Sequence, residues 1–138
     1  MQIITKSYIN DLVYKVNGAA IEVHKALGPG LLESVYHQCL KYELKERNIK
    51  FQSELIVPVQ YKGVNIEANL RCDLFIENIL VVELKAVDRM HPIYEAQIMT
   101  YMKLLKSPKG LMINFNVKHL YSEGQKTYVN EWYRNLPA

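Results

Sequence analysis

Cysteine is scarce in this chain: Cys39 and Cys72 are the only two, and they do not form a CxxC pair. Two isolated thiols argue against a disulfide framework and fit a reducing compartment. The first six residues, MQIITK, lack the apolar stretch of a signal peptide, and no apolar run approaches membrane-spanning length. We therefore expect a cytoplasmic protein with no membrane association.

Glycine and proline are also few, at six and five, and the formal net charge is only +3. This composition is typical of an ordinary globular protein. With 138 residues, the chain is expected to form one domain, residues 1–138, whose core needs no disulfide or structural metal. Lysine and arginine are spread along the chain, so the charge permits contact with a polyanion without indicating it.

Hydrophobic periodicity predicts three helices. Apolar residues spaced i, i+3, i+4 indicate amphipathic helices over about residues 6–27 and 32–47, and Gly28-Pro29-Gly30 separates them. A later helix is expected from Pro92 to about Lys106, because proline favours the first helical position.

Alternating and continuous apolar runs predict strands between these helices. Pro58 indicates that the first strand lies at a sheet edge or is bulged, and Lys62-Gly63 forms a turn into the second. The last strand should enter the sheet interior, and the pattern after it is ambiguous. The predicted strands span residues 51–61, 64–75, 79–87 and 111–115.

The third strand ends in two charged residues. Its apolar run, residues 79–82, is typical of a central strand buried on both faces, yet it continues into Glu83-Leu84-Lys85. Because side chains alternate along a strand, Glu83 and Lys85 share a face. Buried charges need partners, and a second acid, Asp73, lies in the preceding strand. Two carboxylates beside a lysine indicate a divalent-cation site suited to phosphodiester hydrolysis.

The two carboxylates can share this site only in one pairing register. A two-residue turn at Glu77-Asn78 would pair Asp73 with Val82 and direct the carboxylates to opposite faces. We therefore expect a three-residue connection or a β-bulge between Phe75 and Leu80.

The element order, with Asp73 and then Glu83-Leu84-Lys85 on the second and third strands, resembles the PD-(D/E)XK nuclease superfamily. Residues 30–36, GLLESVY, match the motif that names the GxxExxY family, a branch of that superfamily. Residues 97–101, QIMTY, are similar to the QxxxY element of its exonuclease-like members. One departure is Cys72, which stands where the signature has proline.

The resemblance covers nearly the whole chain and implies a restriction-endonuclease-like α/β fold. Its α-β-β-β-α-β core would hold a mixed central sheet flanked by helices, and this chain would add an N-terminal helix. By the same resemblance, Asp73 and Glu83 would bind Mg²⁺, or Mn²⁺ as a substitute, and the Leu84 carbonyl and Glu33 would complete the ligand shell.

The remaining roles also follow from the resemblance. Lys85 would orient or deprotonate the attacking water, or bind the phosphate. Gln97 and Tyr101, which lie at i, i+4 on one helical face, would orient Lys85, the water or the scissile phosphate. The expected function is metal-dependent hydrolysis of nucleic acid, with DNA as the expected substrate. The alternative is a catalytically silent module that binds nucleic acid or protein and retains the fold.

Each of these residues also has a structural interpretation. Glu33 could complement a helix start, Asp73 could cap a turn, and Lys85 could be a solvated edge charge. Gln97 and Tyr101 could form a pair at the core margin. The four histidines show no metal-ligand spacing; His24 and His37 are expected at a helix surface or boundary, and His91 alone near the site. A domain of this size often needs a homodimer or protein partner to hold a long duplex, although no interface motif is evident.

Overall fold

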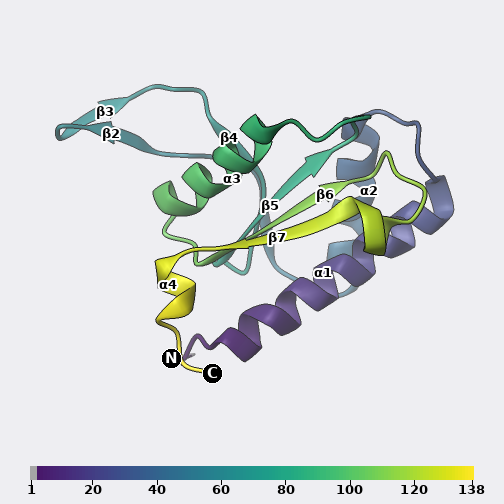
Figure 1. The fold of residues 1–138 in the computed structure, drawn as a ribbon, viewed down its shortest axis with the longest axis horizontal. Helices are drawn as coiled ribbons and strands as arrows, with labels where there is room; N and C mark the ends of the chain where they lie inside the picture. Colours follow the sequence, from purple (N-terminus) through teal and green to yellow (C-terminus); the bar gives the residue numbers. More distant parts are fainter. Residues whose placement is uncertain (1–2) are drawn as a thin grey trace.

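A mixed sheet of five strands carries the fold in the computed structural model, which describes residues 3–138 (Figure 1). The strand order is β1-β4-β5-β6-β7; β5 and β6 are parallel and the other neighbours are antiparallel. This architecture confirms the predicted fold class. The strands are β1 (Phe51–Ile56), β4 (Arg71–Ile76), β5 (Leu80–Lys85), β6 (Lys109–Asn114) and β7 (Gln125–Val129).

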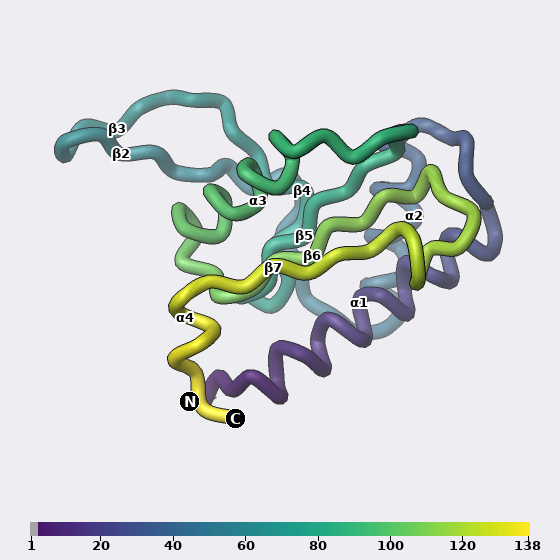
Figure 2. Tube along the Cα trace, viewed as in Figure 1, coloured from purple at the N-terminus to yellow at the C-terminus, as the bar shows by residue number. Residues whose placement is uncertain are grey.

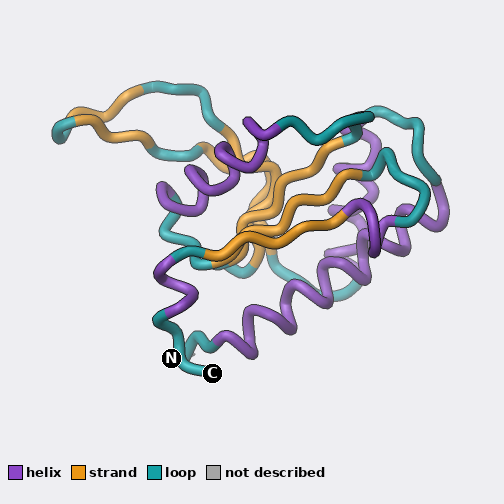
Figure 3. The backbone as a smooth tube through the Cα atoms, viewed as in Figure 1, coloured by secondary structure: helices purple, strands orange, loops and turns teal. Residues whose placement is uncertain are grey.

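Helices cover both faces of this sheet, as Figure 3 shows. On one face, α1 (Lys6–Leu27) and α2 (Glu33–Glu46) share a core with Leu80, Val82 and Leu84 of β5. On the other, α3 (Pro92–Leu104) packs in a second core that includes Val81. Because side chains alternate along β5, Glu83 and Lys85 share a face with Val81 and therefore lie on the α3 side.

The helix limits follow from local chemistry and agree with the predictions to within two residues. Thr5 caps α1, since its Oγ1 accepts a hydrogen bond of 3.0 Å from the Tyr8 N–H. Gly28 ends α1 with a φ of 68°, which favours glycine. Pro92 begins α3 directly after its N-cap, His91.

Two of the predicted strands are wrong in extent. Each of the strands expected over 51–61 and 64–75 is divided, and the middle pieces, β2 (Val59–Tyr61) and β3 (Val64–Ile66), form a separate two-stranded sheet. This hairpin projects from the body (Figure 2). The interruption has a physical reason, because Pro58 cannot donate to a sheet ladder. β1 is an edge strand, as Pro58 indicated.

The end of the chain adds elements that the sequence pattern left ambiguous. After β6 come a π-helical turn, η1 (Leu120–Gly124), then β7, and a short helix, α4 (Glu131–Arg134). β6 begins at Lys109, two residues before the predicted strand, and β7 pairs with it, so that β6 is interior as expected. Within residues 3–138, the structure contains no helix with the length and apolarity that a membrane span requires.

Candidate functional site

The candidate site lies where β4 and β5 separate. Their ladder pairs Ile76 with Leu80 and Leu74 with Val82, which leaves a three-residue connection, residues 77–79. The expected register is thus confirmed, and it sets Asp73 level with Glu83 on the neighbouring strand. A two-residue hairpin would have sent these carboxylates to opposite faces.

The backbone pairing of β4 and β5 ends at Leu74 and Val82, and beyond this point backbone N–H groups donate to carboxylates of the opposite strand. The Asp73 N–H donates to Glu83 Oε2 at 2.8 Å, and the Leu84 N–H donates to Asp73 Oδ2 at 2.8 Å. Each carboxylate is therefore fixed by the backbone of the other strand. The N–H and C=O of one strand residue point to the same side, so the Leu84 carbonyl also faces the gap.

Each carboxylate keeps one oxygen free. Neither Asp73 Oδ1 nor Glu83 Oε1 accepts a hydrogen bond from the residues that the structure describes. In the same part of the chain, no fully buried side-chain oxygen or nitrogen lacks a partner, so these two oxygens remain open to solvent or a ligand. Together with the Leu84 carbonyl they form a hard oxygen donor set, which suits Mg²⁺.

The electrostatics of the pair also favour a cation. Burial raises the pKa of Glu83 and the charge of Asp73 raises it further, whereas the Asp73 N–H and Lys85 lower it. Burial likewise raises the pKa of Asp73, whereas the hydrogen bond from the Leu84 N–H and the charges of His37 and Lys85 lower it. Two desolvated carboxylates held together repel each other, and a divalent cation would relieve that repulsion.

Lys85 is half-buried at the end of β5, where it lowers the pKa of both carboxylates. It makes no salt bridge with any described residue. Instead its Nζ lies 4.4 Å from the ring centroid of Tyr94, a cation–π contact that directs the ammonium toward α3.

Two further predicted site residues lie on α3. Gln97 Nε2 donates to the Tyr101 hydroxyl at 3.1 Å. Tyr101 is buried, and its pKa is raised by desolvation and then by the charges of Glu83 and Asp73. The structure therefore brings the Gln97–Tyr101 pair within electrostatic range of the two carboxylates.

Glu33 lies at the rim of the site as the first residue of α2, with an exposed side chain. Partial desolvation and the charge of Asp73 raise its pKa, and Lys85 lowers it, so Glu33 is also within electrostatic range. Tyr36 holds the preceding loop, because its hydroxyl donates to the Gly28 carbonyl at 2.6 Å and accepts from the Leu31 N–H at 3.1 Å. This contact fixes where α2 begins.

The three carboxylates are not assembled into one cage. Across residues 3–138, no group of three or more His, Cys, Asp or Glu side chains is spaced to hold a metal ion. Asp73, Glu83, the Leu84 carbonyl and Glu33 all stay predicted ligands, and the hydrogen bonds hold the first two carboxylates across neighbouring strands. This set still fits Mg²⁺, which is commonly held by one or two carboxylates while it keeps several waters.

His37 and Tyr94 are site neighbours that the sequence reasoning missed. His37 Nε2 lies 3.0 Å from Ser53 Oγ, and its charge lowers the pKa of Asp73. Helical spacing was the available signal, since His37 follows Glu33 by four residues and Tyr94 precedes Gln97 by three. His91, the histidine expected near the site, caps α3 through a 3.0 Å hydrogen bond from the Ile93 N–H.

Comparison with known proteins agrees with this geometry. The family model of the PD-(D/E)XK nuclease superfamily matches residues 10–127, a range that includes both strands of the site and all of α3. No curated protein and no solved structure gave a match. The matched range covers most of the chain, and the protein therefore belongs to the PD-(D/E)XK nuclease superfamily.

Proposed function

We propose that this protein is a Mg²⁺-dependent deoxyribonuclease of the GxxExxY branch, able to use Mn²⁺ as a substitute. Superfamily membership implies a metal-dependent nuclease with a nucleic-acid substrate. The observation that carries the proposal is the pair of backbone hydrogen bonds, from the Asp73 N–H to Glu83 and from the Leu84 N–H to Asp73, which leaves one oxygen of each carboxylate free.

In the proposed mechanism, Asp73, Glu83 and the Leu84 carbonyl hold the cation, and Glu33 approaches from the rim. The cation, when bound, would lower the pKa of a water molecule that it binds and neutralise charge on the phosphate. The two backbone N–H donors keep the carboxylates from turning away, so the ligands are preorganised before substrate arrives.

Lys85 is proposed to act on the water or the phosphate. Its ammonium cannot ligate a cation, but it can bind a phosphate oxygen or, in its neutral form, accept a proton from water. The Tyr94 ring holds the ammonium through the 4.4 Å cation–π contact, and the Gln97–Tyr101 pair borders the same face of the sheet. The Tyr94 contact keeps Lys85 on the α3 side, where a scissile phosphate would meet it.

A cleavage assay tests the proposal directly. Purified protein is incubated with single-stranded and double-stranded DNA and RNA, in Mg²⁺, in Mn²⁺ and in chelator. We expect metal-dependent cleavage of DNA that chelator abolishes and that Asp73→Asn lowers by at least about a hundredfold. Cleavage of RNA alone would overturn the choice of substrate. Binding of nucleic acid without cleavage in either metal would favour the silent module.

Glu33→Gln should weaken metal affinity or turnover, by about threefold to thirtyfold, without unfolding the domain. The reason is that the substitution removes a charge within electrostatic range of Asp73 but leaves the Tyr36 hydrogen bonds to the loop intact. Metal titration by calorimetry and a melting curve measure the two effects. Glu43→Gln, on the same helix and outside the site, is the control; equal effects of both variants would remove Glu33 from the site.

The metal-free protein should lose stability as pH rises from about 5 to about 8. Burial and the charge of Asp73 raise the pKa of Glu83 from 4.5 to about 8. The folded state therefore binds a proton that the unfolded state has released in this range, so stability declines with increasing pH. Melting temperatures in chelator measure this slope.

Glu83→Gln should flatten that slope, because glutamine does not titrate. Adding Mg²⁺ at about pH 8 should restore stability to the parent and not to the variant, since the cation requires the ionised carboxylate. An equally steep slope in Glu83→Gln would assign the pH dependence to other groups.

A further inference from the structure

Residues 57–70, which comprise the β2–β3 hairpin and the segments that connect it to β1 and β4, form an arm with one apolar face. Val59 pairs with Ile66 and Tyr61 with Val64, so these four side chains share a face, whereas the Gln60–Asn65 pair occupies the other. Tyr61, Val64 and Ile66 are 63%, 59% and 45% exposed. Among the strands of residues 3–138, β2 and β3 pair only with each other.

Such an arm needs a partner. An isolated two-stranded hairpin is marginally stable in water, and its apolar face gains free energy only when it is covered. The arm carries one lysine, Lys62, and one glutamate, Glu67, so its charges sum to zero. A polyanion is bound mainly through clustered positive charge, which this arm lacks. An apolar protein surface is therefore the better match.

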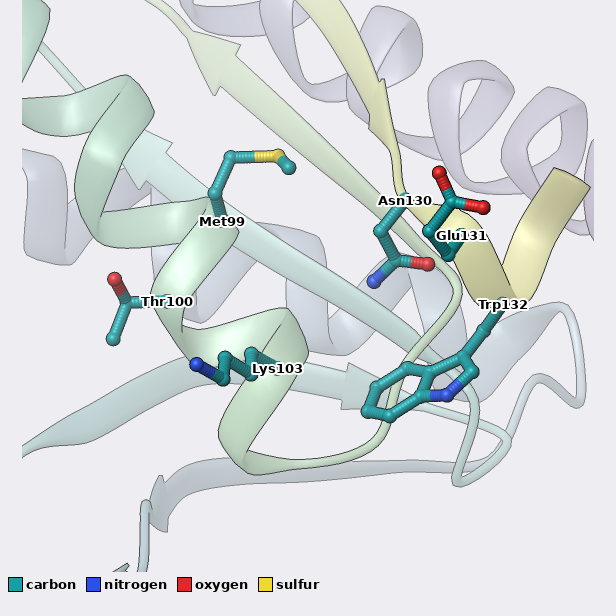
Figure 4. Close-up of a pocket in the computed structure, with 6 residues that line it drawn as sticks. All are labelled: Met99, Thr100, Lys103, Asn130, Glu131 and Trp132. Atoms are coloured by element: carbon teal, nitrogen blue, oxygen red, sulfur yellow. The ribbon is translucent and has the colours of Figure 1, made fainter.

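The chain itself presents such a surface. A cavity of about 480 Å³ lies between α3 and α4, and most of the surface that lines it is apolar. Figure 4 shows its lining residues, which are Met99, Thr100, Lys103, Asn130, Glu131 and Trp132. Trp132 and Met99, on its two walls, are 44% and 37% exposed. Lys103 and Glu131 supply one charge of each sign to the lining, as Lys62 and Glu67 do on the arm. The β2–β3 hairpin lies on the same side of the molecule as α3 and α4, at the left in Figure 1.

We infer that the protein forms a two-fold homodimer in which the apolar face of each arm packs into the α3–α4 cavity of the other copy. An isologous interface of this kind covers both unpartnered features at once. A stable specific interface buries roughly 1,200–2,000 Å² in total. Two arm–cavity contacts supply two separate buried areas toward that size, whereas arm-to-arm packing supplies one and leaves both cavities uncovered.

The single tryptophan makes the interface directly measurable, because Trp132 lines the cavity and is the only one in the chain. Full-length protein is studied by sedimentation velocity and tryptophan fluorescence from about 1 to 100 µM. We expect a dimer, with a blue shift of the emission as concentration rises. Tyr61→Ser should weaken dimerisation at least about tenfold and abolish the shift.

Matched variants separate the possible outcomes. Tyr42 on α2 is also 63% exposed, so Tyr42→Ser is the control and should leave dimerisation unchanged. Trp132→Ser, checked for folding by its melting curve, should weaken dimerisation as Tyr61→Ser does. A monomer at every concentration would overturn the inference, and so would a dimer that Tyr61→Ser leaves unchanged.

Two further results would assign the arm to another occupant and also overturn the inference. Sensitivity to Tyr61→Ser but not to Trp132→Ser would indicate arm-to-arm packing. Loss of oligonucleotide binding in Tyr61→Ser, with the parent monomeric, would indicate that the arm contacts nucleic acid. None of these measurements depends on nuclease activity, so the inference can fail while the proposed function holds.

Discussion

Lys85→Ala is expected to lower the rate of DNA cleavage by about a thousandfold or more while metal affinity changes only a few-fold. The ammonium group is within electrostatic range of both carboxylates, since it lowers the pKa of each, yet it cannot ligate a cation. Removing it deletes the group that binds the phosphate or moves the water's proton, and such groups contribute roughly 10²- to 10⁴-fold. Single-turnover kinetics at saturating metal measure the rate, and calorimetry measures the affinity.

Lys109→Ala is the matched control for this variant. Lys109 is also half-buried, on β6, and its Nζ lies 4.7 Å from the ring centroid of Tyr133. The Lys109→Ala variant should cleave at the parental rate. Lys109 lies at the start of β6, whereas the β6 residue that pairs with Lys85 is Asn114, at the other end of that strand. Lys85→Arg separates the roles: arginine binds phosphate but stays protonated, so retained activity would favour phosphate binding. Parental turnover in metal-saturated Lys85→Ala would show that Lys85 is only structural.

Magnesium is expected to raise the melting temperature of the parent protein, and Asp73→Asn should remove most of that shift. For a dissociation constant on the order of 1 mM, about 10 mM Mg²⁺ stabilises the fold by roughly 1.4 kcal/mol. In a domain of this size that corresponds to roughly 3–6 °C. The shift arises because only the folded chain brings Asp73 and Glu83 together. Differential scanning fluorimetry with and without metal measures it.

The metal-free variant is informative as well. Asp73→Asn should be at least as stable as the parent in chelator, because it relieves the repulsion with Glu83 while the amide oxygen can still accept the Leu84 N–H. Asp11→Asn, at an exposed position of α1, should keep the full metal shift. If Mg²⁺ and Mn²⁺ leave the parent unmoved and Asp73→Asn is simply destabilised, the acids are structural and the silent module is the better interpretation.

Much of the site could be predicted because its constraints are local. Side-chain alternation along β5 is enough to align Glu83 with Lys85, and the parity of the connection, residues 77–79, decides whether Asp73 joins them. The caps of α1, Thr5 and Gly28, are equally local signals. These features depend on neighbours along the chain or on a single hairpin.

Other features depend on which elements meet. The sequence pattern marks His37 and Tyr94 only as helix residues. Their position near the site depends on the packing of α2 and α3 on opposite faces of the sheet. The sequence did not reveal the arm, because apolar and polar residues keep alternating through Val57 and Pro58. The pairing of β1 with β4, however, ends at Ile56 and Arg71. An alternating pattern does not reveal whether a neighbouring strand exists.

By itself, the sequence determined the α/β class, the limits of the long helices, and the strand positions of Asp73, Glu83 and Lys85. The spacing of apolar residues and the number of residues between strands can be read from the chain itself, so these features can be predicted before the packing is known. Only the tertiary structure decided that each carboxylate accepts a hydrogen bond from a backbone N–H of the other strand, and that the Lys85 ammonium contacts the Tyr94 ring. It also decided that the hairpin arm lies on the same side of the molecule as α3 and α4. These relations join residues far apart along the chain, and their distances are set by how whole elements pack.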